Sequence, residues 1–259
     1  MSADSFPIAW EEAGSGNPVI FLHGVGGGAA SWKFQLDHFG RTRRAIAWDM
    51  PGYGGSKLLE TTTFPALADA LKRMMDHLGL EKADIVGHSI GGMVAQEFIA
   101  AHPERVRKLV LSATSPAFGS PDGDFQKKFV AARLGPLDAG KTMADVAEEV
   151  VPELIGDDAD PDGVALARQC MSRVPNETYR ATMQCLVTFD RRDTLKQIAV
   201  PTLMLAGEKD SNAPAPMMER MAARVPGARY VCLEGAGHLA NMECPARFDA
   251  AVEEFLDLV

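Results

Sequence analysis

Short apolar runs recur along this chain, and segments with helical spacing separate them. The runs lie at 18–22, 44–48, 83–86, 106–112, 202–205 and 230–233. Such runs are typical of strands buried on both faces of a parallel sheet. The helical segments between and after them are 64–78, 92–101, 216–224 and 247–258. This alternation predicts an α/β fold, with a mostly parallel, doubly wound sheet that helices cover on both faces.

The alternation stops between about residues 117 and 195, where the sequence turns helical and irregular with many proline and glycine breakers. An insertion of this length is too long for a plain connection between two strands. We therefore predict a core domain of residues 1–116 and 196–259 and a helical cap of residues 117–195. The cap is expected over the C-terminal edge of the sheet, where open α/β sheets bind ligands. The opening stretch 6–13 predicts one antiparallel edge strand.

The net charge of −9 argues against nucleic acid and anionic membrane as partners, because both require clustered Lys and Arg. No apolar run approaches the length that spans a bilayer, and residues 1–5 lack the basic start of a signal peptide. The four cysteines form no Cys-x-x-Cys pair, and none has a histidine at metal-ligand spacing. The sequence thus predicts a cytoplasmic protein with free thiols and no metal site. The sequence does not determine the oligomeric state, and a homo-oligomer is one of the open alternatives.

Residues 87–91 read Gly-His-Ser-Ile-Gly and fit G-x-S-x-G, the nucleophile elbow. The serine of such an elbow sits on a turn so tight that small residues are needed two positions away on each side. The bare pattern also occurs by chance, as a serine in a glycine-rich turn. Here an apolar run precedes Ser89 and a helical segment follows it, which is the context that the motif requires. Ser89 is therefore the predicted nucleophile, at a helix N-terminus that favours developing negative charge.

With this elbow the chain resembles the α/β-hydrolase family, and the resemblance covers essentially the whole chain. Residues 22–27, Leu-His-Gly-Val-Gly-Gly, are similar to the family's His-Gly oxyanion loop. By that resemblance, the backbone N–H groups of Val25 and Ile90 hold the oxyanion. Residues 49–56 resemble the family's D-x-P-G-x-G-x-S turn, in which Asp49 is expected to be structural.

The family takes its acid and its histidine from later strands, in that order. Asp210 follows the run at 202–205 and occupies the family's acid position. Residues 235–239, Gly-Ala-Gly-His-Leu, follow the last run and match the catalytic histidine loop, so the resemblance assigns His238 as the base. The rival acids are Glu208, Asp190 and Asp193.

These roles predict a serine hydrolase that forms an acyl-enzyme on Ser89 and acts on a small-molecule ester or lactone. The predicted mechanism needs no metal and no organic cofactor. Within the family, the segments around the His-Gly loop, the elbow and the histidine loop look most similar to 3-oxoadipate enol-lactonases. Those enzymes open small carboxylate-bearing lactones in aromatic catabolism. A substrate anion would need a cation, and the cap offers four candidates without distinguishing among them: Arg133, Arg168, Arg173 and Arg180.

Other activities on the same scaffold remain open at this stage. A generic carboxylesterase fits the motifs nearly as well as a lactonase. Hydrolases that cleave C–C bonds of ring-cleavage products resemble Gly-Asn-Ser rather than the Gly-His-Ser seen here. The scaffold also serves lyases, cofactor-free oxygenases and ligand receptors, and fold alone does not decide among them.

Overall fold

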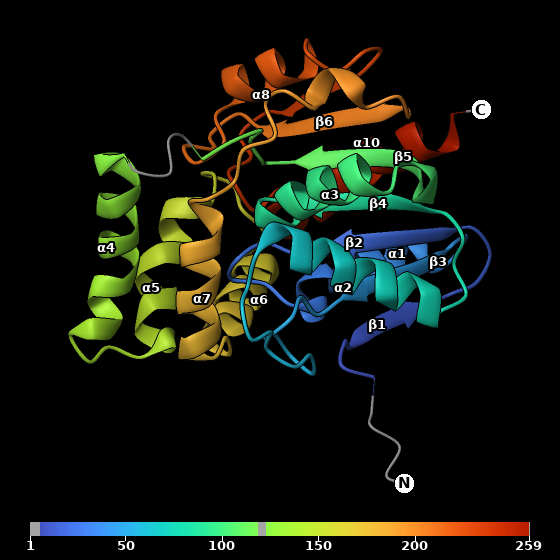
Figure 1. The fold of residues 1–259 in the computed structure, drawn as a ribbon. Coiled ribbons are helices and arrows are strands. Elements are labelled where there is room, and N and C mark those ends of the chain that lie inside the picture. The colour runs from blue at the N-terminus through green and yellow to red at the C-terminus, as the bar shows by residue number, and fades with distance from the viewer. Residues whose placement is uncertain (1–5, 119–122, 259) are drawn as a thin grey trace, which may run out of the picture.

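The computed structural model of the chain describes residues 6–118 and 123–258. Its centre is one seven-stranded sheet with the order β1-β3-β2-β4-β5-β6-β7 (Figure 1). The strands are β1 (Trp10–Ala13), β2 (Pro18–Leu22), β3 (Arg44–Trp48), β4 (Ala83–His88), β5 (Val106–Ser112), β6 (Thr202–Gly207) and β7 (Arg229–Leu233). Only β1 runs antiparallel to its neighbour, β3. The predicted α/β class with a mostly parallel sheet is confirmed.

Helices connect the strands, and two of them, α2 and α5, begin at side-chain caps. The α-helices are α1 (Lys33–Phe39), α2 (Phe64–His77), α3 (Ile90–Ala101), α4 (Asp124–Asp138), α5 (Met143–Leu154), α6 (Pro161–Ser172), α7 (Asn176–Leu186), α8 (Ala215–Ala222), α9 (Ala240–Glu243) and α10 (Pro245–Asp257). Helix α2 starts where the Thr63 hydroxyl accepts a hydrogen bond from the Ala66 N–H. Helix α5 starts at a capping box between Thr142 and Asp145. Among the described residues, no helix combines the length and the apolar character needed to span a bilayer.

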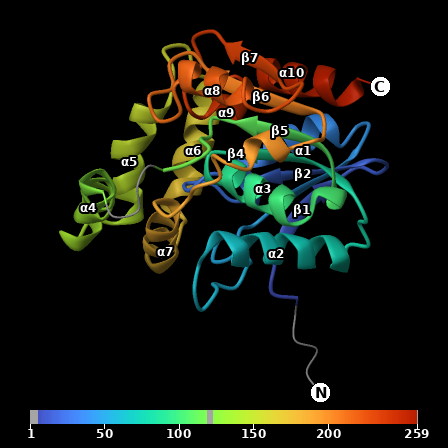
Figure 2. The ribbon, with the colours of Figure 1, turned by 45° about the horizontal axis from the view of Figure 1, so that its top comes forward.

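Each strand contributes side chains to two apolar cores, because successive residues point to opposite faces of the sheet. In β2, Ile20 and Leu22 join a core with α2, α3 and α8, whereas Val19 and Phe21 join a second core with α1 and α10. Figures 1 and 2 show α2 and α3 on one face of the sheet and α1 and α10 on the other. The sheet is therefore doubly wound, as the alternating pattern predicted.

Two local predictions need correction or fall outside the description. The expected edge strand at 6–13 is wrong for its first half, since β1 begins at Trp10. The preceding residues bond to the 49–57 turn instead: the Ala9 N–H donates to Ser56 and the Pro7 carbonyl accepts from the Lys57 N–H. Residues 1–5, on which the expectation about a signal peptide depends, lie outside the described residues, as do residues 119–122 within the predicted cap.

Helices α4–α7 all lie between β5 and β6 in the chain, and we call them the cap helices. Figure 1 shows them gathered at the end of the sheet toward which the arrowheads of β2 and β5 point. That end is the C-terminal edge of the parallel strands. Contacts fix the cap helices there: Thr178 Oγ1 donates to the Gly52 carbonyl, and the His238 N–H donates to the Leu154 carbonyl.

A buried polar network holds the segment after β7 against α1 and α10. Gln35 Nε2 donates to Asp249 Oδ1 at 2.7 Å and to the Asn241 carbonyl at 3.0 Å. Asn241 Nδ2 in turn donates to the Ser31 carbonyl at 3.1 Å. Because Asn241 lies three residues after His238, the network helps to place the histidine loop.

Asp249→Asn is expected to raise the free energy of unfolding at pH 8 by up to about 3 kcal/mol. Burial raises the pKa of Asp249 to about 6, above the ordinary value of 3.8. The folded state therefore disfavours ionisation of Asp249. The resulting loss of folding stability grows as the pH rises from about 4 to about 6, and it is fully present above pH 6. Urea denaturation at pH 5 and pH 8 measures it. The gain should be larger at pH 8, and a loss of stability at pH 8 would contradict the account.

Candidate active site

Ser89 stands on a strained turn between the end of β4 and the start of α3. Its φ of 53° and ψ of −121° lie in a region that non-glycine residues rarely adopt. A Cβ on Gly87 would lie 2.6 Å from the Gly91 carbonyl oxygen, and one on Gly91 would lie 2.2 Å from the Leu22 carbonyl oxygen. Both flanking positions therefore need glycine, which explains the spacing of the motif.

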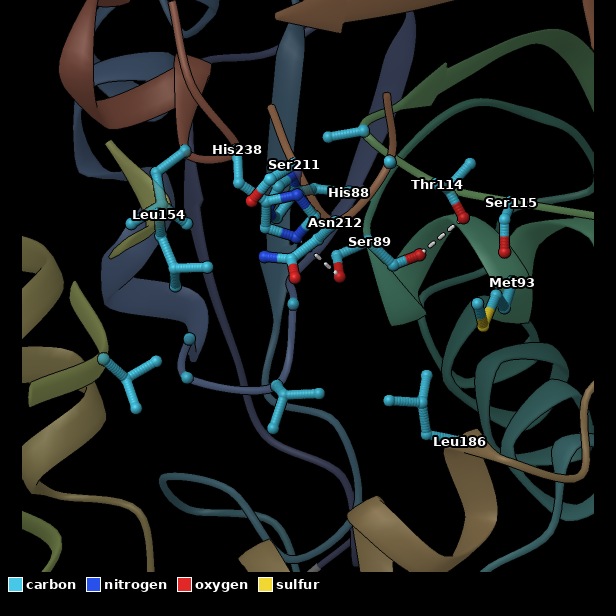
Figure 3. Close-up of a pocket in the computed structure, with 18 of the residues that line it drawn as sticks. His88, Ser89, Met93, Thr114, Ser115, Leu154, Leu186, Ser211, Asn212 and His238 are labelled. Atoms are coloured by element: carbon cyan, nitrogen blue, oxygen red, sulfur yellow. Dashed lines mark hydrogen bonds between the residues drawn. The ribbon is translucent and has the colours of Figure 1, made fainter. Parts of the chain in front are cut away.

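Strand β5 and the loop after it hold the Ser89 backbone in this conformation. The Ser89 N–H donates to the Ser112 carbonyl at 3.0 Å. The Thr114 hydroxyl donates to the Ser89 carbonyl at 2.7 Å, the right-hand dashed line in Figure 3. Both backbone polar groups of Ser89 are thus fixed while its side chain stays free to face the cavity.

The three residues predicted as nucleophile, base and acid lie in one hydrogen-bonded row. His238 Nε2 lies 3.0 Å from Ser89 Oγ, and His238 Nδ1 lies 2.8 Å from Asp210 Oδ2. Figure 3 shows the Ser89 hydroxyl and the His238 ring facing each other. Asp210 follows β6 and His238 follows β7, so adjacent parallel strands deliver both side chains to the same edge of the sheet.

The buried Asp210 carboxylate is held in its charged form. Oδ1 accepts from the Asn212 N–H at 2.8 Å and from the Ala213 N–H at 3.0 Å. Burial by itself would raise the pKa of Asp210, but the His238 charge and the hydrogen bonds from His238, Ala213 and Asn212 outweigh burial and hold it below its usual range.

The rival acids point elsewhere in the described structure. Glu208 accepts a hydrogen bond from the Gly235 N–H at 2.9 Å, and Asp190 pairs with Arg192. Asp193 is exposed. Of the four acids considered, Asp210 is the one bonded to His238.

Hydrogen bonds within the His-Gly loop fix the peptide group that joins Gly24 to Val25, and so set the direction of the Val25 N–H. The Gly24 carbonyl accepts from His23 Nδ1 at 2.7 Å and from the Gly27 N–H at 3.0 Å. Because His23 Nε2 accepts from the Met50 N–H, the proton of this neutral ring is on Nδ1. Burial lowers the pKa of His23 to about 4, which keeps it neutral. In a trans peptide the N–H points opposite to the carbonyl, so the Val25 N–H is directed away from this anchor.

His88, next to Ser89, is a second buried imidazole beside the predicted base. Its ring centroid lies 5.0 Å from that of His238. Burial, and then the charge of His238, lowers the pKa of His88 to about 3. A neutral His88 does not compete with His238 for a proton.

A cavity of about 850 Å³ lies over this row of residues, between the sheet edge and the cap helices. Two arginines, Arg133 and Arg192, line it together with His88 and His238. Most other lining side chains are apolar, and those from the cap helices and the preceding loop include Phe118, Phe125, Phe129, Val150, Val151, Leu154, Met171, Met183 and Leu186. Within residues 6–118 and 123–258, no group of three His, Cys, Asp or Glu side chains is placed to hold a metal ion.

A family model described as alpha/beta hydrolase fold matches residues 17–245 of this chain. The chain belongs to this family. The match includes the elbow, the acid and the histidine loop as well as the cap helices between β5 and β6. The predicted fold class is therefore confirmed as the alpha/beta hydrolase fold.

Similar members of the alpha/beta hydrolase fold family include esterases. The pimeloyl-acyl-carrier-protein methyl ester esterase of Aeromonas hydrophila subsp. hydrophila is 27% identical and is matched over 96% of this chain and 99% of its own length. A solved thermophilic esterase from Thermogutta terrifontis, with malate bound, is 30% identical with a TM-score of 0.88, over 96% of this chain and 92% of that one.

An enol-lactonase from Burkholderia xenovorans LB400 has the same fold. Its TM-score is 0.87 over 97% of this chain and 96% of that one, at 24% identity. An identity this low shows the fold alone. The finer resemblance to enol-lactonases therefore stays a prediction.

Two buried residues of this alpha/beta hydrolase fold site were not singled out from the sequence. Glu243 accepts hydrogen bonds from the N–H groups of Gly237, Leu239 and Gly156, and so joins both sides of the histidine loop to the connection between α5 and α6. Tyr53 donates to the Val25 carbonyl at 2.8 Å. The sequence gives only weak signals for these two hydrogen-bonding roles. Glu243 is an acidic residue five positions after His238, and Tyr53 is an aromatic residue inside the 49–56 turn.

Proposed function

We propose that this protein is a serine hydrolase that cleaves small carboxylic esters or lactones through an acyl-enzyme on Ser89. The observation that carries the proposal is the row of hydrogen bonds from Ser89 Oγ through His238 to Asp210. This row opens into a largely apolar cavity, which suits the acyl or alcohol part of a small substrate. The esterase names of the similar proteins support an ester substrate.

The chemistry follows from the placement of the three side chains. A serine hydroxyl is a weak nucleophile near neutral pH, so His238 Nε2 accepts its proton as Ser89 Oγ attacks the substrate carbonyl. Asp210 holds the Nδ1–H of His238 and stabilises the imidazolium that forms. His238 then returns the proton to the departing alkoxide. Water, deprotonated by His238, attacks the acyl-enzyme, and the proton passes back to Ser89 Oγ as the carboxylic acid leaves.

In this proposal the oxyanion is bound by the backbone N–H groups of Val25 and Ile90. Neither N–H donates to an acceptor in the described part of the chain. Ile90 is the first residue of α3, so its N–H also carries the positive end of the helix dipole. Donors of this kind each contribute on the order of 10²–10³ in rate.

Tyr53→Phe is expected to lower kcat by about tenfold, the effect of one buried hydrogen bond that positions the oxyanion loop. The Tyr53 hydroxyl, which also lies 3.3 Å from Thr182 Oγ1, fixes the carbonyl of the residue whose N–H binds the oxyanion. Steady-state kinetics with a p-nitrophenyl ester measures the change, with KM expected to move less than kcat. Thr182→Val, which leaves the bond to Val25 in place, is the control, and a wild-type kcat in Tyr53→Phe would contradict the assignment.

A turnover screen across short p-nitrophenyl esters, aliphatic lactones and C–C ring-cleavage products tests the proposed function. We expect hydrolysis of esters or lactones, together with stoichiometric labelling of Ser89 by a fluorophosphonate. Turnover of ring-cleavage products alone would overturn the ester assignment. A chain that hydrolyses no compound and resists the fluorophosphonate would overturn the hydrolase itself.

A further inference from the structure

The cap helices present an apolar wall to the cavity, with polar groups at two positions. Of the cavity-lining residues that come from α4–α7, only Arg133 on α4 and Tyr179 on α7 carry polar side chains. The other three cap arginines considered from the sequence do not line the cavity: Arg168 pairs with Glu148, Arg180 pairs with Asp138, and Arg173 is exposed. The Arg133 guanidinium is thus a positive charge in an otherwise apolar wall, where a group of opposite charge would stabilise it.

Arg133 is incompletely neutralised by the protein. Its guanidinium carbon lies 5.5 Å from the centroid of the Phe129 ring, and Nη1 lies 3.6 Å from Glu153 Oε2. The Arg133 side chain is 21% exposed, whereas that of Glu153 is 67% exposed, so water screens the carboxylate. Arg192, the other arginine of the cavity, differs because both carboxylate oxygens of Asp190 bond to it.

Tyr179 adds a hydroxyl to the same wall. The residue is 1% exposed and lines the cavity, yet its hydroxyl bonds to none of the described residues. Burial raises the pKa of Tyr179, and the charge of the nearby Arg133 opposes the rise. The hydroxyl therefore stays protonated and can donate to an acceptor in the cavity.

We propose that Arg133 and Tyr179 form a subsite for a carboxylate at the end of the substrate remote from the scissile bond. This inference rests on the proposed function and narrows the substrate class to small esters or lactones that carry a free carboxylate on an aliphatic chain. The Arg133 guanidinium offers two parallel N–H donors, which match the two oxygens of a carboxylate, and the Tyr179 hydroxyl supplies a further donor. The apolar wall of the cap helices would contact the aliphatic chain between this carboxylate and the scissile bond. A local cation is needed because the net charge of −9 repels anions in general.

The test compares two series of esters with equal chain length. One series is the mono-p-nitrophenyl esters of straight-chain dicarboxylic acids, and the other is the neutral p-nitrophenyl alkanoates. In the wild type, the ratio of kcat/KM for the anionic ester to that for the neutral ester should peak at one chain length. Arg133→Met is expected to lower this ratio about tenfold or more, and Tyr179→Phe by a smaller factor.

Arg180→Met is the matched control, because it removes the same charge from the cap outside the cavity. It should leave the ratio unchanged. A wild type without a preference for the anionic series at any length would overturn the subsite. So would an Arg133→Met variant with an unchanged ratio, or an Arg180→Met variant that lowers the ratio equally.

A binding measurement separates this inference from the proposed function. Calorimetric titration with adipate should detect binding to the wild-type chain that Arg133→Met weakens about tenfold or more. Lack of turnover in both ester series would contradict the proposed function, whereas equal adipate binding by wild type and Arg133→Met would contradict the subsite.

Discussion

Ser89→Ala is expected to lower kcat for every ester substrate by at least about 10³-fold. The variant keeps the cavity and the oxyanion donors but removes the oxygen that forms the acyl bond. Ser211 also lines the cavity, so Ser211→Ala is the matched control and should retain most of the activity. Initial rates with a p-nitrophenyl ester measure both variants.

The fold should survive this substitution. Alanine at position 89 has the same strained backbone to adopt, and the backbone bonds to Ser112 and Thr114 do not involve the lost hydroxyl. A thermal melt close to that of the wild type would show that the loss of activity is chemical. Near-normal turnover in Ser89→Ala, or a comparable loss in Ser211→Ala, would contradict the assignment of the nucleophile.

Asp210→Asn should lower kcat by about 10³–10⁴-fold. Oδ1 of Asp210 accepts two backbone N–H groups, so an amide at this position must keep its oxygen there and turn its NH₂ toward His238. His238 Nδ1 would then accept, the ring proton would move to Nε2, and Nε2 could no longer take a proton from Ser89. The loss of kcat relative to the wild type should persist across neutral pH. The pKa of Asp210 lies below its usual range, so the wild-type carboxylate stays ionised there, and the amide of the variant does not titrate.

Glu208→Gln is the control for this second prediction, since Glu208 is the nearest rival acid in the sequence. Its carboxylate accepts from the Gly235 N–H and does not contact His238 among the described residues, so kcat should fall less than about threefold. A large loss in Glu208→Gln together with normal activity in Asp210→Asn would show that the acid is assigned wrongly.

The sequence was sufficient for the fold class and for the residues of the hydrogen-bonded row. The reason is physical: a parallel sheet brings the C-terminal ends of its strands to one edge, so short motifs after β4, β6 and β7 must converge. It was insufficient at the edge strand, where no pattern in residues 6–9 reveals that their hydrogen bonds go to the 49–57 turn. Glu243 was missed for a similar reason, because its three N–H partners lie on two loops that meet only in the folded chain.

The cap resists sequence reasoning more than the core does. The break in the alternation predicts an insertion, and α4–α7 occupy most of it. The spacing of apolar residues in the cap sequence does not tell which face of each helix meets the cavity. Arg133, Arg168 and Arg180 therefore look equivalent in the sequence. The structure separates them, since two pair with carboxylates away from the cavity and one lines it.

The central claim is that a covalent acyl group forms on Ser89, and mass spectrometry of the chain quenched during turnover of a p-nitrophenyl ester tests it most directly. The account predicts a burst of p-nitrophenol equal to the amount of enzyme and an added acyl mass on the peptide that contains Ser89. Turnover without any acylated species under rapid quenching, or acylation at another residue with Ser89 unmodified, would contradict it.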